Sequence, residues 1–406
     1  MSKKQHWIIT GTFVLFAILL TFLATTTFWY GKMKTAIEDA RAQSSRESTL
    51  YDAEKLGRIE QMVDAYFIGE TDRDQMTETL ADAMIAGLGD EWSYYISAEE
   101  YASYLESVAN AYVGIGVTIS WEDENPKGFT IIDVTPDSPA YAAGLQIGDY
   151  MHKVNGEDVT ELGMDETKMR VRGEEGTDVT LTILRGDEEF DVVVTRASIK
   201  TVNVTWELLD DDVAYIRIRN FEAHCAEDSL AAIKAAMQQG AKGIVFDLRF
   251  NPGGLKSELV TLLDALLPAG PLFRSLDYSG RETVDESDAR CLELPMAVLV
   301  NVDSYSAAEF FAAAMQEYGA ATIVGTQTYG KGYFQTTHEL PDGSAIHIST
   351  GKYFTPNGVS LVGVGITPDR VLELSDEQYA DLYYGRLAHE DDLQLQEAVQ
   401  AVKSAE

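Results

Sequence analysis

The sequence is poor in basic residues and in cysteine, and each shortage excludes a class of protein. Only 31 of its 406 residues are Lys or Arg against 66 Asp or Glu, so the net charge is −35. This charge repels phosphates and argues against nucleic-acid binding. The two cysteines, Cys225 and Cys291, match no metal-binding spacing. They are either thiols or, in an oxidising compartment, a disulfide.

One stretch at the N-terminus lacks charge altogether. No charged residue lies between Lys4 and Lys32, which exceeds the ~20 apolar residues that span a bilayer. Lys3 and Lys4 before the span favour a cytoplasmic N-terminus. We therefore predict a single-pass membrane anchor at 1–34, with the rest of the chain outside the cytoplasm. A cleaved signal peptide is the alternative, although "LATTT" is a poor cleavage site.

The rest of the chain changes its pattern three times. Residues 35–110 place apolar residues at three- and four-residue spacing, which predicts a helical region. Residues 111–199 hold short strands punctuated by glycine turns, which predicts a compact β-rich domain. Residues 200–375 alternate continuous apolar strands with helices, which predicts an α/β core with a covered sheet. Residues 376–406 are predicted to form a second helical region.

Two serines stand at the start of a predicted helix in "NVDSYSAAEFFAAAMQEYG", residues 301–319. The apolar residues that follow recur at helical spacing, so one face of this helix is predicted to be buried. Ser304 or Ser306 can be its N-cap, and Ser306 with Glu309 matches a capping box. A nucleophilic serine is the other interpretation, and the serines alone do not decide between the two.

A lysine with an unusual setting lies downstream, in "TQTYGKGYFQ". Lys331 stands between two glycines at the entry to an apolar strand, which predicts that its amine is desolvated. Desolvation lowers the pKa of a lysine from ~10.4 towards the range in which it is a base. Gln335 is predicted to share the strand face of Lys331 and to hold its amine by a hydrogen bond. The motif is no phosphate loop, because Gly follows the lysine where Ser or Thr is required.

Four motifs in this order, "DLRFNPGG", "VLVNVDSYSAAE", "IVGTQTYGKGYFQ" and "YFTPNGVSLVGVGITPD", resemble the carboxyl-terminal processing proteases. The resemblance covers the chain from about residue 60 to its end. It implies an α/β fold with a Clp-protease/crotonase-like protease core. It also implies an extracytoplasmic serine endopeptidase, expected here in a bacterial cell membrane. The resemblance implies that Ser306 is the nucleophile, that Lys331 is the general base and that Gln335 orients the lysine.

The same resemblance implies an oxyanion hole made of main-chain amides. "DLRFNPGG" ends a buried strand in a glycine turn before a helix, so its amides are available to a negative oxygen. We place the two donors at Ala307 and at Gly253 or Gly254. The family pattern is altered at Tyr305, which is expected to affect the approach to the nucleophile. No metal and no organic cofactor is expected.

The β-rich segment has a resemblance of its own. "GIGV", "DSPAYAAGLQIGD" and "VNG" look like a PDZ domain. In that family a glycine-rich loop, here Gly114, Ile115, Gly116 and Val117, offers its amides to the terminal carboxylate of a peptide. The expected partners are protein substrates with unstructured, apolar C-termini. A PDZ fold that packs on its neighbour without a ligand is the alternative.

Arg172 matches an arginine of the related PDZ modules that helps to couple peptide binding to protease activation. An exposed structural arginine is the other interpretation. The resemblance also implies that the terminal helical regions can form a homodimer, and plain packing onto the core is equally consistent with their patterns.

Two other functions remain open from the sequence. A Ser-His hydrolase with His224, His338 or His347 as base is one, although no G-x-S-x-G elbow occurs. A catalytically inactive PDZ adaptor is the other, although Ser306 and Lys331 are both present.

Overall fold

The computed structural model describes residues 53–122, 128–288 and 291–405. Within these residues, no helix has both the length and the apolarity that a membrane crossing needs. The anchor predicted at 1–34 lies outside them. The chain divides into one unit that ends at Thr77 and a second that begins at Glu78.

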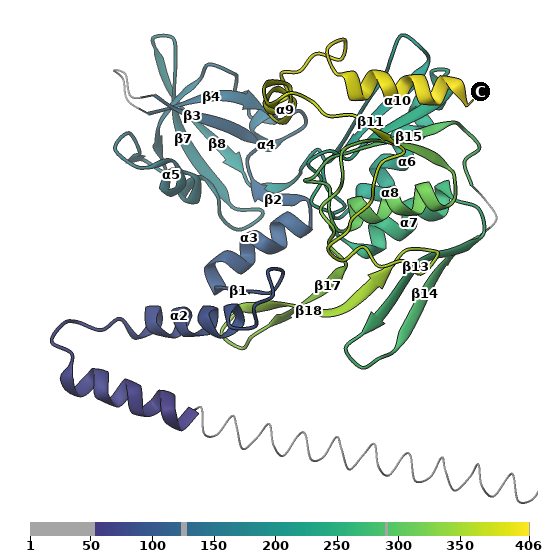
Figure 1. The fold of residues 1–406 in the computed structure, drawn as a ribbon. Helices are drawn as coiled ribbons and strands as arrows, with labels where there is room; N and C mark the ends of the chain where they lie inside the picture. The colour runs from purple at the N-terminus through teal and green to yellow at the C-terminus, as the bar shows by residue number, and fades with distance from the viewer. Residues whose placement is uncertain (1–52, 123–127, 289–290, 406) are drawn as a thin grey trace, which may run out of the picture. The chain divides into compact units, whose positions relative to one another are not determined.

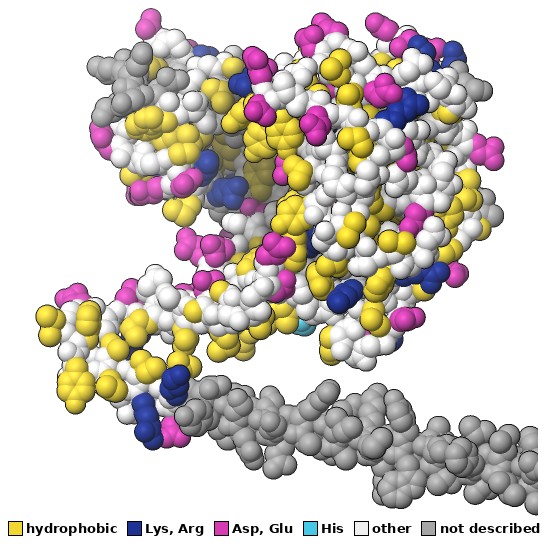
Figure 2. Space-filling model, in the orientation of Figure 1, with side chains coloured by type: hydrophobic (Ala, Val, Ile, Leu, Met, Phe, Trp, Pro, Cys, Tyr) yellow, Lys and Arg dark blue, Asp and Glu magenta, His cyan; other side chains and the backbone are white. Residues whose placement is uncertain are grey.

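The described part of the first unit is helical. Residues 53–66 form a helix, and α2 (Arg73–Ala86) begins in this unit. Large apolar side chains are exposed on this helix and just after it (Figure 2), namely Ile59, Met62, Tyr66, Phe67 and Ile68.

The centre of the second unit is a six-stranded sheet (Figure 1). Its order is β10-β11-β12-β15-β16-β19, and every neighbouring pair except β10 with β11 is parallel. The strands are β10 (Val204–Leu208), β11 (Val213–Ile218), β12 (Gly243–Asp247), β15 (Met296–Val300), β16 (Ala321–Gly325) and β19 (Arg370–Val371). Every residue of β12 and β15 is buried, as is typical of parallel strands that are covered on both faces.

Helices cover both faces of this sheet. They are α6 (Cys225–Gln238), α7 (Lys256–Leu266) and α8 (Ala307–Glu317) on one face and α10 (Leu393–Ser404) on the other. Successive strand side chains point to opposite faces, so Phe246 packs with the first group and Val245 with α10. Cys225 is buried and Cys291 is half-buried, and both are free thiols, so no disulfide joins them.

A second sheet is antiparallel and includes the two strands that follow the lysine segment. Its strands are β1 (Tyr94–Ile96), β13 (Gly270–Asp277), β14 (Glu282–Ser287), β17 (Tyr333–Glu339) and β18 (Ala345–Phe354). Strand β18 is central, because it pairs with β1, β13 and β17. Helix α3 (Ala98–Val108) follows β1 and leads to the β-rich segment.

The β-rich segment has its own hydrophobic core. β2 (Ala111–Gly114) pairs with β9 (Ala197–Lys200), so the chain enters and leaves the segment at one place. Between them lie β3 (Val117–Glu122), β4 (Gly128–Val134), α4 (Pro139–Ala142), β5 (Tyr150–Val154), β6 (Glu157–Asp158), α5 (Met164–Val171), β7 (Asp178–Arg185) and β8 (Glu188–Thr195). Phe129, Leu181 and Ile183 are among the side chains that form its core.

The last elements are α9 (Asp376–Tyr383) and α10. They differ in how they pack. α10 buries six residues against the sheet, whereas Leu382 is the one buried residue of α9. The fold is thus a mixed α/β core that carries an inserted β-rich domain.

Candidate active site

A cleft of about 1080 Å³ in the second unit collects most of the predicted site residues. Ser306, Lys331, Gln335, Gly253 and Gly254 all line it. They come from loops after three different strands of the central sheet and from the strand that follows the lysine. The structure therefore brings together residues that are far apart in the chain.

Ser306 occupies a strained position at the start of α8. It is the N-cap residue, with φ 58° and ψ −123°, and its side chain makes no capping hydrogen bond. Non-glycine residues seldom adopt positive φ, and such strain is typical of functional sites. The capping-box interpretation of Ser306 and Glu309 is therefore wrong, because the Glu309 carboxylate turns to another loop.

Ser304 has a structural role. Ser304 is fully buried. Its hydroxyl donates a hydrogen bond to the carbonyl of Leu248 at 2.8 Å and accepts one from the amide of Asn301 at 3.0 Å. These bonds join the loop after β15 to the loop after β12. Its hydroxyl is thus committed to the fold, in contrast to that of Ser306.

The two glycines of the loop after β12 fit against their neighbours with no room for a side chain. A Cβ on Gly253 would lie 2.6 Å from Cβ of Ser306, and one on Gly254 would lie 2.4 Å from the carbonyl carbon of Phe221. Both residues have positive φ, which glycine adopts without strain. Only glycine permits this close approach to the serine.

The hydrogen bonds of this loop separate the two candidate oxyanion donors. The amide of Gly253 donates to Oδ1 of Asn251 at 2.8 Å. Among the described residues, the amides of Gly254 and Ala307 have no acceptor. Gly254 is therefore the glycine of this pair whose amide is left for a negative oxygen, and its role beside Ala307 stays a prediction.

Lys331 is largely withdrawn from water. Burial lowers its pKa to about 8, although the charges of Asp90 and Glu91 oppose the shift. Its amine lies 4.1 Å from the centroid of the Trp92 ring, in a cation–π contact. In the part of the chain that the structure describes, no hydrogen bond joins this amine to the Ser306 hydroxyl.

Three aromatic rings form a cluster beside the amine. Trp92 lies 5.7 Å from Tyr305 and 5.3 Å from Tyr329 between centroids, and these tyrosines are 5.6 Å apart. Tyr305, where the sequence departs from the family pattern, therefore belongs to the aromatic wall beside Lys331. The sequence assigned Trp92 no role beyond membership of the helical region predicted at 35–110, because no local pattern reveals a partner so far along the chain.

Tyr353 of β18 connects the serine to the lysine loop. Its hydroxyl donates to the carbonyl of Lys331 at 2.6 Å and interacts with the Ser306 hydroxyl. Burial raises the pKa of Tyr353 well above its usual value, so the phenol keeps its proton. Its backbone amide also donates to the carbonyl of Gly332. Through these two hydrogen bonds Tyr353 holds the backbone of Lys331 and Gly332 in place.

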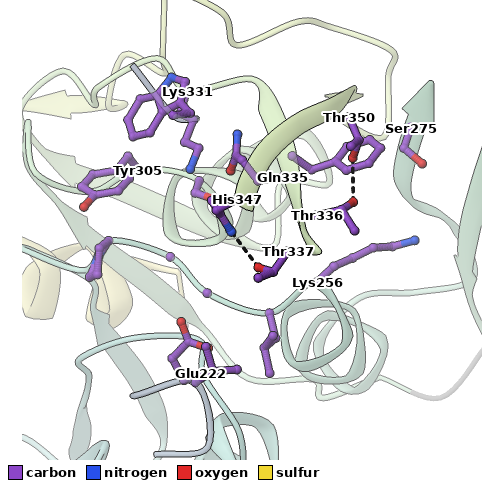
Figure 3. Close-up of a pocket in the computed structure, with 18 of the residues that line it drawn as sticks. Glu222, Lys256, Ser275, Tyr305, Lys331, Gln335, Thr336, Thr337, His347 and Thr350 are labelled. Atoms are coloured by element: carbon purple, nitrogen blue, oxygen red, sulfur yellow. Dashed lines mark hydrogen bonds between the residues drawn. The ribbon is translucent and has the colours of Figure 1, made fainter. Parts of the chain in front are cut away.

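Gln335 lies near Lys331 but contacts other groups. Figure 3 shows Lys331, Gln335 and His347 together in the cleft. The Gln335 amide donates to the carbonyl of Tyr333 at 3.2 Å and to the Ser349 hydroxyl at 3.0 Å. A register shift between Phe334 and Gln335 breaks the regular alternation on which the shared-face argument depended. The predicted bond to the lysine is not formed in this structure, and a role in orienting it stays a prediction.

His347 and His338 line the same cleft, and His224 does not. Nδ1 of His347 is 2.8 Å from the Thr337 hydroxyl (Figure 3). Burial, helped by the charge of Lys331, lowers the pKa of His347 to about 4. This histidine is therefore neutral at physiological pH.

Glu309 supports the lysine loop, and the sequence did not predict this role. It is fully buried in α8, and its Oε1 accepts the Thr328 hydroxyl and, at 2.7 Å, the amide of Gly330. Burial raises its pKa to about 7, and these hydrogen bonds oppose the shift. The carboxylate holds the loop on which Lys331 stands.

The predicted peptide-binding loop lines a second cleft, of about 330 Å³, in the β-rich domain. Gly114, Ile115, Gly116 and Val117 line it together with Lys168 and Arg172. Arg172 forms an ion pair with Glu106 of α3 at 2.9 Å, and its guanidinium lies 5.5 Å from the Tyr112 ring centroid. The loop amides and two cations therefore border the same space.

Known proteins match this chain in both domains. The model for peptidase family S41 matches residues 212–372, and the PDZ domain model matches residues 130–185. A "Probable CtpA-like serine protease" of Staphylococcus epidermidis is 31% identical over 384 residues, which cover 94% of this chain and 75% of that protein. A "Carboxy-terminal-processing protease" of Bartonella bacilliformis is 31% identical over 385 residues, which cover 92% and 83%.

Among solved structures, a photosystem II D1 C-terminal processing protease is 26% identical, with a TM-score of 0.45 over 77% of this chain and 86% of that chain. The identity to the two relatives over most of their length decides the class: the chain belongs to peptidase family S41 and carries a PDZ domain. Within that family it is a serine-type protease of the carboxyl-terminal processing group. The resemblance drawn from the sequence is confirmed.

Proposed function

We propose that this protease uses a Ser306–Lys331 dyad, selects protein substrates by their C-terminal tails, and is held at the outer side of a cell membrane by residues 1–34. The observation that carries the dyad is the presence of a strained serine and a desolvated lysine in one cleft. With a pKa of about 8, roughly a tenth of the lysine is neutral at about pH 7. A neutral amine is the form that can accept a proton.

The first chemical step is the attack of the serine. Lys331 turns away from the Trp92 ring and takes the hydroxyl proton as Oγ of Ser306 bonds to the scissile carbonyl carbon. The oxygen that becomes negative accepts hydrogen bonds from the amides of Ala307 and Gly254. The N-terminus of α8 adds its positive end at the same place.

The second step releases the products. The protonated lysine gives its proton to the leaving amine, and the neutral amine then activates the water that hydrolyses the acyl-enzyme. The chain's own residues supply each proton transfer.

Covalent labelling tests the nucleophile. The full chain is treated with a fluorophosphonate, digested and examined by mass spectrometry. We expect the adduct on Ser306 and none on the buried Ser304, together with loss of cleavage of an unfolded protein. An adduct on another serine, or cleavage that survives Ser306→Ala, would refute the assignment.

Selection of tails is assigned to the cleft beside Gly114–Val117. The loop amides can receive a terminal carboxylate, and Lys168 and Arg172 add positive charge at its border. Ile119 and Met151 line the same cleft and suit an apolar last side chain. An extended peptide would pair with β3.

Amidating the C-terminus of a substrate is therefore expected to weaken its recognition. The loss of a charged acceptor facing the loop amides should raise KM about tenfold or more while kcat changes little. The measurement compares one unfolded substrate as free acid and as amide, with a third version that ends in Asp as a control for the apolar pocket. Equal KM values for acid and amide would show that the tail is not read in this way.

Membrane attachment and assembly are the remaining parts of the proposal. The uncharged segment and the lysines before it support an anchor. Retention of the full chain in the membrane pellet after alkaline carbonate extraction tests it, and release into the supernatant contradicts it. Homodimer formation through the terminal helical regions stays a prediction, which light scattering of the detergent-solubilised chain can test.

A further inference from the structure

Helix α9 lies outside the residues matched by the peptidase model, yet its aromatic side chains contact both loops that carry the oxyanion donors. One loop follows β12 and contains Phe250 and Gly254. The other follows β15 and contains Asp303 and Ser306. Because β12 and β15 are neighbours in the sheet, the two loops leave it side by side.

Each of these loops contains a strained residue. Phe250 has a φ of 62° and Ser306 a φ of 58°. A bulky residue at positive φ persists only where its surroundings hold it in place. Gly254 lies four residues after Phe250 in the same loop. The backbone conformation of Phe250 therefore affects the direction in which the chain reaches the amide of Gly254.

Two tyrosines of α9 pack against Phe250. Its ring meets the edge of Tyr379 at 4.9 Å and of Tyr383 at 5.3 Å between centroids. Its backbone amide donates to Oδ1 of Asn301 in the other loop, at 3.0 Å. Edge-to-face rings of this kind contribute beyond the area that they bury.

Tyr379 contacts the second loop as well. Its hydroxyl donates to the carboxylate of Asp303 and lies 3.5 Å from Nδ2 of Asn301. The same side chain therefore restrains the strained Phe250 through its ring and the serine loop through its hydroxyl. Burial and the Asp303 charge raise the pKa of Tyr379, so the phenol keeps the proton that it donates.

The two loops are also joined directly, by the amide of Tyr305 to the carbonyl of Asn251 at 3.2 Å. α9 itself packs loosely. Leu382 is its one buried residue, and a cavity of about 130 Å³ lined by Asn301, Tyr379 and Leu382 lies beside it. Its hold on the loops thus depends on a few aromatic contacts.

We propose that α9 sets the spacing of the two oxyanion donors and that Tyr379 is a positioning residue for catalysis. The inference rests on the proposed role of Gly254 and Ala307. It adds that a helix at the C-terminal end, which touches no reacting atom, controls how well the negative oxygen is held. Losing this restraint should affect the transition state more than the bound substrate.

The test uses the full chain with Tyr379→Ala, Tyr379→Phe and, as a matched control, Tyr384→Ala. Tyr384 is an exposed tyrosine that follows α9 directly, and its ring contacts Tyr383 and Arg386 rather than either loop. We expect Tyr379→Ala to lower kcat about 10- to 100-fold with KM nearly unchanged, because small misplacements of catalytic groups have such effects. Tyr379→Phe keeps the ring contact and should lie between Tyr379→Ala and the wild type.

Two further readouts separate positioning from a general loss of stability. Inhibition by a peptide aldehyde, which forms an oxyanion on the serine, should weaken in parallel with kcat for Tyr379→Ala. Hydrogen exchange of residues 248–254 and 301–307 should become faster in that variant, while exchange in β12 and β15 stays the same. Tyr384→Ala should change none of these.

The outcomes are distinct from those that test the dyad. Unchanged exchange in both loops, or unchanged kcat and aldehyde affinity with faster exchange, overturns the proposal. Faster exchange with an equal loss of kcat and aldehyde affinity supports it. If the fluorophosphonate does not label Ser306, the proposed function fails. If it labels Ser306 and the aldehyde affinity of Tyr379→Ala is unchanged, this inference alone is overturned.

Discussion

Replacing Lys331 by alanine is expected to lower kcat/KM by about 10³-fold or more, because the serine then has no base in reach. Lys331→Arg should be as inactive, although it keeps the positive charge, because a guanidinium does not give up its proton at working pH. The measurement is the cleavage rate of an unfolded protein substrate at about pH 8. His338→Ala is the matched control, since that residue lines the same cleft.

The pH profile of the wild type gives a second, independent check of the base. The folded-state pKa of Lys331 is lowered to about 8, so the neutral amine is lost as the pH falls through this value. kcat/KM should therefore rise with pH, with a midpoint near 8, and be about tenfold higher on the alkaline plateau than at about pH 7. If His347 were the base, the midpoint would lie near its own pKa of about 4. A flat profile between about pH 6 and 9 would exclude Lys331.

Replacing Arg249 by leucine is expected to destabilise the protease core by about 3–5 kcal/mol, because it leaves buried carboxylates without their partner. Arg249 is 2% exposed. Its guanidinium binds Asp247 at 2.9 and 2.7 Å and Asp392 at 3.0 and 2.8 Å. Asp392 is also the N-cap of α10, so the same arginine joins α10 to β12, the strand before the loop of Gly253 and Gly254.

The measurement is the thermal unfolding midpoint, followed by calorimetry, with Lys403→Ala as the control. Lys403 forms a solvent-exposed ion pair with Asp211 at 2.9 Å, and its loss should change stability by less than about 1 kcal/mol. The double variant Arg249→Leu with Asp392→Leu should be less destabilised than the sum of the single changes, because the pair is coupled. If the unfolding midpoint of Arg249→Leu equals that of the control variant, the buried ion-pair network contributes little to the stability of the core.

The start of α8 shows where the sequence pattern was sufficient and where it failed. Helical spacing predicted the helix correctly, and Phe310, Phe311 and Met315 are fully buried as expected. The helix is not buried on one face alone, however, because every residue from Ala307 to Met315 is buried. The same spacing suggested that Glu309 caps the helix, whereas this side chain is buried and holds the loop of Lys331. Spacing describes neighbours on one helix, and the partner of Glu309 lies beyond the next strand.

The glycines and the glutamine show a second limit. The sequence left Gly253 and Gly254 as equal candidates, because both are glycines of one turn. The choice depends on which amide a side chain already occupies, and here Asn251 occupies that of Gly253. The predicted hydrogen bond from Gln335 to Lys331 is not formed in this structure, where the pairing register shifts just before Gln335, and its orienting role stays a prediction.

The residue types and their order along the chain were enough to determine the family, the PDZ domain and the candidates Ser306 and Lys331, because these depend on local motifs. Only the tertiary structure decided the environment of those candidates. Trp92 and Tyr353 reach the lysine and the serine from distant segments, and Tyr379 of α9 contacts both the loop after β12 and the loop after β15. Desolvation, pKa and the availability of an amide are set by neighbours in space, and a linear sequence does not reveal those neighbours.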